Sequence, residues 1–145
     1  MEKLRAWLKR RGFGLEVQAG AEDCVCFQSA MVSINSRLTP QSRLAALLHE
    51  CGHVDVLHKR LKNRRKPVAG ATLRQWGSTV NPEGMRRMRV RINVVTEEIE
   101  AWDRGEAIAK RLKIRYNKKS FDRARTRALM TYFRWTAGAR QKQDQ

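Results

Sequence analysis

The amino-acid sequence predicts an α+β fold, in which a small antiparallel sheet packs on a long helix and two or three further helices complete the domain. Short β-prone runs occupy residues 15–35, apolar residues recur at helical spacing from 44 to 61, and two more helical patterns follow in the C-terminal half. The chain has 145 residues, 41% of them hydrophobic, which suffices for one modest core. We therefore expect a single domain over residues 1–137 and a flexible tail over residues 138–145.

The N-terminal third supplies one helix and the sheet. Leu4, Trp7 and Leu8 lie at helical spacing between basic residues, so the first dozen residues predict an amphipathic helix. Three short apolar runs follow between residues 15 and 35, separated by turn residues. We interpret these runs as two or three strands of an antiparallel sheet.

The remaining elements are helices. Thr39 is a competent N-cap and Pro40 suits the first helical position, so a helix begins there. A second helix is expected from about residue 89 to 112, and Ser120 can cap a last one. Residues 62–89 lack periodicity and predict a long basic loop. The apolar faces comprise Leu44, Leu47, Leu48, Val54, Leu57 and Leu61 in the first helix, and Phe121, Ala124, Ala128, Leu129, Tyr132 and Phe133 in the last.

The first of these helices carries the motif His49-Glu50-Cys51-Gly52-His53. Histidines at i and i+4 share one helix face, so both imidazoles can bind a single Zn²⁺ ion. Glu50 is offset from this face and can act as general base on a water whose pKa the zinc lowers. The motif predicts a zinc site with His49 and His53 as ligands and Glu50 as the catalytic base.

A catalytic zinc site also needs a third protein ligand, and the helix expected at 89–112 offers three glutamates. On a helical projection, Glu98 falls within an apolar stripe that includes Val94, Val95 and Ala101. A carboxylate in such a stripe is costly unless a cation compensates it. Glu98 is therefore the predicted third ligand, and Glu97 and Glu100 remain as solvent-facing or supporting groups.

Residues 34–38, the 49–53 motif and Glu98 through Ala101 together resemble the compact zincin peptidases. The nearest group is ImmA/IrrE, with the SprT-like proteins less close. The resemblance covers about 70 residues, from Val32 to Trp102. It implies a minimal zincin-like fold, a bound Zn²⁺, peptide hydrolysis, and substrate pairing along an edge strand, here Met31–Ile34. Cys51 and Trp102 depart from the pattern, since Trp102 stands where Asn or Asp often follows the alanine.

Other polar side chains are weaker candidates. Tyr132 could stabilise an oxyanion, although its apolar face also suits a core tyrosine. His58 faces away from His49 and is not a predicted ligand. Cys24, Cys26 and Cys51 do not match a disulfide framework or a common zinc motif, and buried hydrophobic roles suit them better than chelation.

The charge balance points to a polyanionic partner. The chain has 31 Lys and Arg against 14 Asp and Glu, a net charge of +17. Such an excess predicts salt-sensitive, sequence-independent nucleic-acid binding, and basic clusters flank the 62–89 loop, with a further one between residues 110 and 127. The candidate nucleic-acid-binding residues are Lys59, Arg60, Lys62, Arg64, Arg65, Lys66, Trp76, Arg86, Arg87, Arg89 and Arg91.

The preferred interpretation is a zinc metallopeptidase acting on peptides or proteins near nucleic acid. One alternative is a nucleic-acid-binding or regulatory protein that uses the same scaffold without general proteolysis, and another is an adaptor that grips an acidic partner. No signal peptide or membrane-spanning run is evident, and the cysteines are few. We therefore expect a cytoplasmic protein without a membrane partner. Within the cytoplasm it could associate with the nucleoid, or it could be virus-encoded and act in the cytoplasm of a host cell. The sequence leaves the oligomeric state open.

Overall fold

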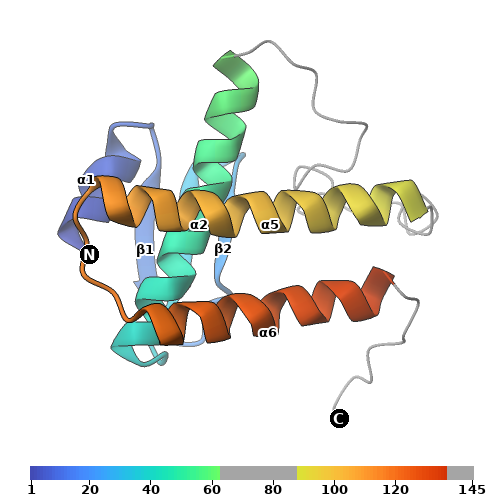
Figure 1. Ribbon diagram of the computed structural model, residues 1–145. Coiled ribbons are helices and arrows are strands. Elements are labelled where there is room, and N and C mark those ends of the chain that lie inside the picture. Colours follow the sequence, from blue (N-terminus) through green and yellow to red (C-terminus); the bar gives the residue numbers. More distant parts are fainter. Residues whose placement is uncertain (63–87, 137–145) are drawn as a thin grey trace.

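The computed structural model describes residues 1–62 and 88–136 of the chain (Figure 1). Within these ranges the fold is α+β, as predicted, with four helices and one three-stranded sheet. Nearly all of the predicted basic loop and the whole predicted tail lie outside the described residues. The elements in chain order are α1 (Glu2–Lys9), β1 (Gly14–Gln18), β2 (Cys24–Cys26), β3 (Met31–Asn35), α2 (Pro40–Lys62), α5 (Met88–Arg111) and α6 (Lys118–Thr136).

The three strands form a mixed sheet in the order β1-β3-β2. β2 pairs antiparallel with β3, as expected, but β1 pairs parallel with β3. The prediction of an antiparallel sheet is therefore wrong for β1, because β2 reverses the chain and β3 then enters the sheet between the two earlier strands. Val32 and Ile34 of β3 are fully buried, in keeping with its central place.

This strand order also corrects the expected substrate-pairing strand. Both sides of Met31–Ile34 already hydrogen-bond to neighbouring strands. An added strand can pair only with an edge that has free N–H and C=O groups. Within the described residues, the edges of the sheet are β1 and β2.

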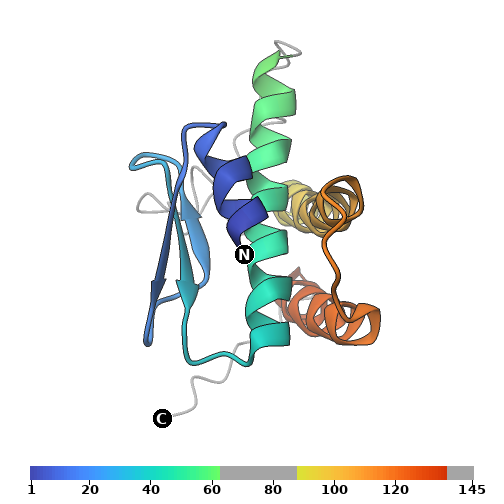
Figure 2. The same ribbon diagram turned by 90° about the vertical axis from the view of Figure 1, so that its left-hand side faces the viewer.

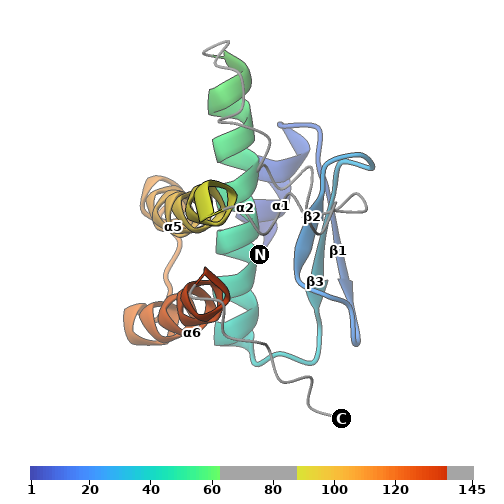
Figure 3. The same ribbon diagram turned by 90° about the vertical axis from the view of Figure 1, so that its right-hand side faces the viewer.

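Helix α2 lies at the centre of the molecule. Figures 2 and 3 show the sheet and α1 on one side of it, and α5 and α6 on the other. Its start is as predicted: Pro40 is the first residue, and the Ser42 backbone N–H donates to Thr39 Oγ1 at 3.3 Å. Of its predicted apolar face, Leu47, Leu48 and Val54 are fully buried. Leu61 is instead 67% exposed, because the C-terminal part of α2 extends beyond the helices packed against it (Figure 1).

Two glycines bring α2 and α5 into backbone contact. A Cβ atom built on Gly52 would lie 1.9 Å from the Ala101 carbonyl oxygen, and one built on Gly105 would lie 2.4 Å from that of Leu48. No other residue type fits at this separation, since such contacts lie below 3.0 Å. The two glycines therefore fix how closely α5 approaches the 49–53 motif.

Helix α6 runs alongside α5 in the opposite direction (Figure 1). Its cap differs from the prediction: the Ser120 backbone N–H donates to Asn117 Oδ1 at 2.9 Å, so Asn117 is the capping residue. Phe121 is buried as expected, whereas Phe133 is 47% exposed. None of the described helices is long and apolar enough to cross a lipid bilayer.

Candidate metal centre

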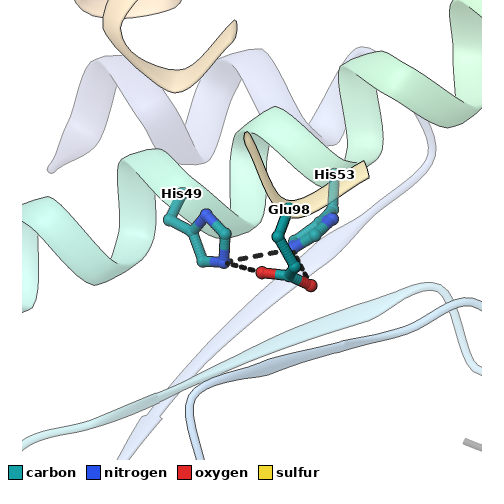
Figure 4. Close-up of side chains that lie close together, drawn as sticks. All are labelled: His49, His53 and Glu98. Atoms are coloured by element: carbon teal, nitrogen blue, oxygen red, sulfur yellow. Dashed lines mark hydrogen bonds and ion pairs between the residues drawn. The ribbon is translucent and has the colours of Figure 1, made fainter. Parts of the chain in front are cut away.

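His49 and His53 come together because they are one turn apart on α2. Their Nε2 atoms lie 3.1 Å apart, and their ring centroids lie 4.4 Å apart. Both rings are largely shielded, with side chains 12% and 4% exposed. Figure 4 shows the two Nε2 atoms directed toward the same point beside α2.

Glu98 of α5 lies between the two histidines and points toward the same place (Figure 4). Its Oε2 lies 3.2 Å from His49 Nε2, its Oε1 lies 3.6 Å from His53 Nε2, and its side chain is 2% exposed. Over residues 1–62 and 88–136, this is the one group of three or more His, Cys, Asp or Glu side chains whose ligand atoms gather closely enough to hold a metal ion. The structure thus brings together the three residues that the sequence selected as metal ligands.

The distances between these atoms match a tetrahedral zinc site. Ligands bonded to Zn²⁺ at about 2.0–2.1 Å in a tetrahedron lie about 3.3 Å from one another. The two Nε2 atoms lie 3.1 Å apart, His49 Nε2 lies 3.2 Å from Glu98 Oε2, and His53 Nε2 lies 3.6 Å from Glu98 Oε1, so the three side chains form a triangle of about this size. An ion therefore fits among the three side chains with little rearrangement.

One carboxylate oxygen of Glu98 lacks a hydrogen-bond donor, which also favours a bound cation. Glu98 Oε2 is buried without a hydrogen-bond partner, although His49 Nε2 is 3.2 Å away. A buried carboxylate oxygen without a donor is costly. A metal ion within the triangle would satisfy it.

The two imidazoles strongly influence the charge of Glu98. Burial alone would raise the pKa of Glu98, but its contacts with His49 and His53 outweigh burial and hold it at about 2. Burial lowers the pKa of His53, and Glu98 more than reverses that effect, so the net shift is upward. The carboxylate is therefore ionised at neutral pH, as a metal ligand must be.

Glu50 lies beside the triangle without belonging to it. Its side chain is buried, with the residue 6% exposed. Burial raises the pKa of Glu50, opposed by the nearby His49 and His53 and reinforced by Glu98. Glu50 is therefore a buried carboxyl group next to the three candidate metal ligands.

Tyr132 approaches the same site from α6. Burial raises the pKa of its hydroxyl, followed by the negative charge of Glu98 and the contact of the hydroxyl with that carboxylate, with Glu50 adding to the effect. Tyr132 is therefore placed at the candidate site and not only in the core. Three helices, α2, α5 and α6, each contribute to the centre.

Trp102 is a site residue that the sequence analysis did not select. Its ring stacks on His49, with centroids 4.2 Å apart and planes inclined by 18°, and it is 3% exposed. The Nδ1 atoms of His49 and His53 are buried without hydrogen-bond partners, whereas metal-binding imidazoles usually donate that N–H to an acceptor. Stacking on Trp102 replaces this support for His49. The available signal was its position four residues after Glu98, on the same helix face.

Glu97 and Glu100, the other two glutamates considered as ligands, form ion pairs with arginines instead. Glu97 is buried and forms an ion pair with Arg60 of α2. Glu100 accepts from Arg104 Nε at 3.1 Å, within one helix. Neither approaches the imidazoles closely enough to join the group, so the choice of Glu98 among the three glutamates agrees with the structure.

The cysteines stay outside the centre. Cys51 is fully buried, and burial raises the pKa of its thiol. Cys24 and Cys26 lie on β2 and do not join a metal-binding group within the described residues. Burial raises the pKa of Cys24, and the next largest cause is the charge of Glu50, which places the start of β2 close to the candidate base.

Of the candidate nucleic-acid-binding residues, the structure describes the side chains of Lys59, Arg60, Lys62 and Arg91. Arg64, Arg65, Lys66, Trp76, Arg86 and Arg87 lie outside the described residues, and Arg89 is placed only as part of the α5 backbone. Arg60 is occupied by Glu97 and Glu100, and Lys59 lies 3.8 Å from Glu100. Arg91 donates to the Thr136 carbonyl and lies over the Trp135 ring, while Lys62 is exposed at the end of α2. Arg60 and Arg91 are thus committed to contacts within the protein.

Comparisons with known protein families, with curated proteins and with solved structures give no match for this chain.

Proposed function

We propose that this protein is a zinc-dependent metallopeptidase. The observation that carries the proposal is the convergence of His49, His53 and Glu98, from two helices, into a triangle of zinc-binding dimensions with Glu50 beside it. A structural zinc site uses four protein ligands, whereas a catalytic one uses three and leaves a position for water or substrate. Three ligands next to a spare buried carboxylate favour the catalytic kind.

Each residue has a distinct role in this proposal. His49, His53 and Glu98 would hold the ion, which, when bound, supplies a Lewis acid that acidifies water and polarises a carbonyl group. Glu50 accepts a proton from the attacking water and later delivers it to the leaving amine. The Tyr132 hydroxyl donates to the oxygen on which negative charge develops.

The position of β2 supports a peptide as the substrate. β2 pairs with β3 on one side and, among the described residues, has no strand on the other. Cys24, at its start, is close enough to Glu50 for the carboxylate to raise its pKa. A peptide that adds to the free edge of β2 would carry its backbone past Glu50, whereas β3 is paired on both sides.

A Glu50→Gln variant tests the proposal. The protein is loaded with one equivalent of zinc, and cleavage of an internally quenched peptide library and of unfolded casein is measured. Glu50→Gln should keep its zinc and lose activity by a factor on the order of 10²–10⁴, the usual contribution of a general base. Glu16→Gln makes the same chemical change at an exposed position on β1 and should cleave at the wild-type rate.

The outcomes separate the proposal from its alternatives. Hydrolysis that persists at the wild-type rate in Glu50→Gln removes Glu50 from the mechanism. Zinc-loaded wild-type protein that cleaves neither substrate favours the regulatory or adaptor alternatives, in which the metal centre serves structure alone.

A further inference from the structure

The outward face of α6 carries a row of cations. Lys119, Arg123 and Arg127 follow one another at four-residue spacing, and Arg134 continues the row nearly two turns later. All four residues are exposed. At 1.5 Å per residue, the row extends over about 22 Å.

These four cations differ from the other basic residues of the same helix. Lys118 is paired with Glu106 and Asp122, and Arg125 with Asp103 at 2.8 Å. Lys119, Arg123, Arg127 and Arg134 form no salt bridge with any residue of the described ranges. Within the described ranges, the acidic groups that form salt bridges with α6 are Asp103, Glu106 and Asp122, and they contact Lys118 and Arg125 and not this row. The charge of the row is therefore available to an external anion.

We propose that this outward face of α6 is a nucleic-acid-binding surface, on which Lys119, Arg123, Arg127 and Arg134 contact phosphates along one strand. The candidate nucleic-acid-binding residues chosen from the sequence lie between 59 and 91, whereas this surface lies on α6 and overlaps the basic cluster at residues 110–127. It develops the expected link to nucleic acid and does not depend on the metal centre.

The character of the row favours nucleic acid over an acidic protein. A phosphate backbone presents one charge per strand about every 3.4 Å along the duplex axis, so about 22 Å matches six base steps. The centres of protein–protein interfaces are depleted of charged residues, whereas here the centre of the face is charged. Met130, 46% exposed, is the apolar residue within the row, and the exposed Phe133 ring at its border can stack on an unpaired base.

The row lies on the side of α6 opposite the candidate site. At 100° per residue, Arg123 is about 180° around the helix from Tyr132, whose hydroxyl contacts Glu98. Nucleic acid on this face would therefore lie away from Tyr132 and the candidate metal centre. The protein would bind nucleic acid with one side of α6 and a peptide with the other.

Fluorescence anisotropy with a labelled 20-base-pair duplex, between 50 and 300 mM NaCl, tests the surface on the full chain. The double variant Arg123→Gln/Arg127→Gln removes two unpaired charges. The matched control, Lys9→Gln/Arg10→Gln, removes two exposed charges that form no salt bridge in the described residues, at the end of α1 and its C-cap. Helix α1 lies on the sheet side of α2 (Figure 2). Loss of two phosphate contacts lowers the salt slope by about 1.8 and the affinity at 0.1 M salt by a factor on the order of 50.

The expected result is this loss in the α6 variant, with the control close to wild type. Equal losses in both variants would overturn the proposal, because binding would then reflect net charge alone. It is equally overturned by negligible duplex binding at 50 mM NaCl, or by displacement of the duplex by polyglutamate as readily as by unlabelled DNA. None of these results bears on hydrolysis, so this proposal and the peptidase proposal fail separately.

Discussion

Replacing Gly52 by alanine should separate the metal ligands without touching any of them. The new Cβ would lie 1.9 Å from the Ala101 carbonyl oxygen, whereas real Cβ contacts stay above 3.0 Å, so the two backbones must move apart by about 1.1 Å. Ala101 belongs to the same helix as Glu98, so the carboxylate moves away from His49 and His53 as well. A displacement of about 1 Å in a catalytic site can lower the reaction rate by on the order of 100-fold.

The expected consequences can be measured separately. Zinc affinity, determined by competition with a chromophoric chelator, should fall by about 10–100-fold, as when the residues that orient metal ligands are changed. The apo protein should also lose about 2 kcal/mol of stability, since overpacking costs roughly 1–3 kcal/mol and the better helix propensity of alanine offsets up to about 1 kcal/mol.

Gly14→Ala is the matched control for this substitution. Its Cβ would approach the flexible end of the Met31 side chain at 2.7 Å, which can move aside, and it lies in β1. Zinc affinity should be unchanged there. Wild-type zinc affinity in Gly52→Ala would refute the reasoning that the contact between α2 and α5 sets the geometry of the ligands.

Three further predictions concern single side chains. Glu98→Gln should lower zinc affinity by at least about 100-fold, whereas Glu100→Gln should not, and equal affinities would remove Glu98 from the ligand set. Trp102→Ala should weaken zinc binding by about tenfold and shift the visible spectrum of the Co²⁺-substituted protein, because the His49 ring loses its stacking partner. An unchanged spectrum would count against this supporting role. The third prediction concerns Glu106. Burial alone would raise the pKa of Glu106, but its contacts with Tyr116, Lys110 and Lys118 outweigh burial and lower this pKa below its ordinary 4.5. The stability that these contacts of Glu106 give to the fold is therefore fully present above about pH 4.5. It is lost as the pH falls through the lower pKa that Glu106 has in the folded protein. Glu106→Gln should reduce the melting temperature at pH 7 by about 2–4 °C, and the difference should shrink at pH 3; a constant difference would contradict this linkage.

The metal ligands could be predicted from the sequence because their chemistry imposes a pattern. Two histidines one turn apart must share a helix face, and a glutamate within an apolar stripe requires a compensating cation. These constraints are local to α2 and to α5. They select Glu98 over Glu97 and Glu100 before the arrangement of the helices is known.

Features that depend on how the elements meet were harder to predict. Alternation of apolar residues indicates which face of a strand is buried but not which strands are neighbours, so the parallel pairing of β1 with β3 was missed. Helical periodicity likewise cannot reveal where a helix leaves the core, which is why Leu61 and Phe133 are exposed. The stacking of Trp102 on His49 depends on the close crossing of α2 and α5, and that crossing was not visible in either helix alone.

X-ray absorption at the zinc edge, on protein reconstituted with one equivalent of zinc, tests the central claim most directly. One tightly held ion per chain is expected, with scattering from two imidazoles and one carboxylate oxygen at about 2.0–2.2 Å. An ion removed by simple dialysis, or a spectrum without imidazole scattering, would contradict this claim.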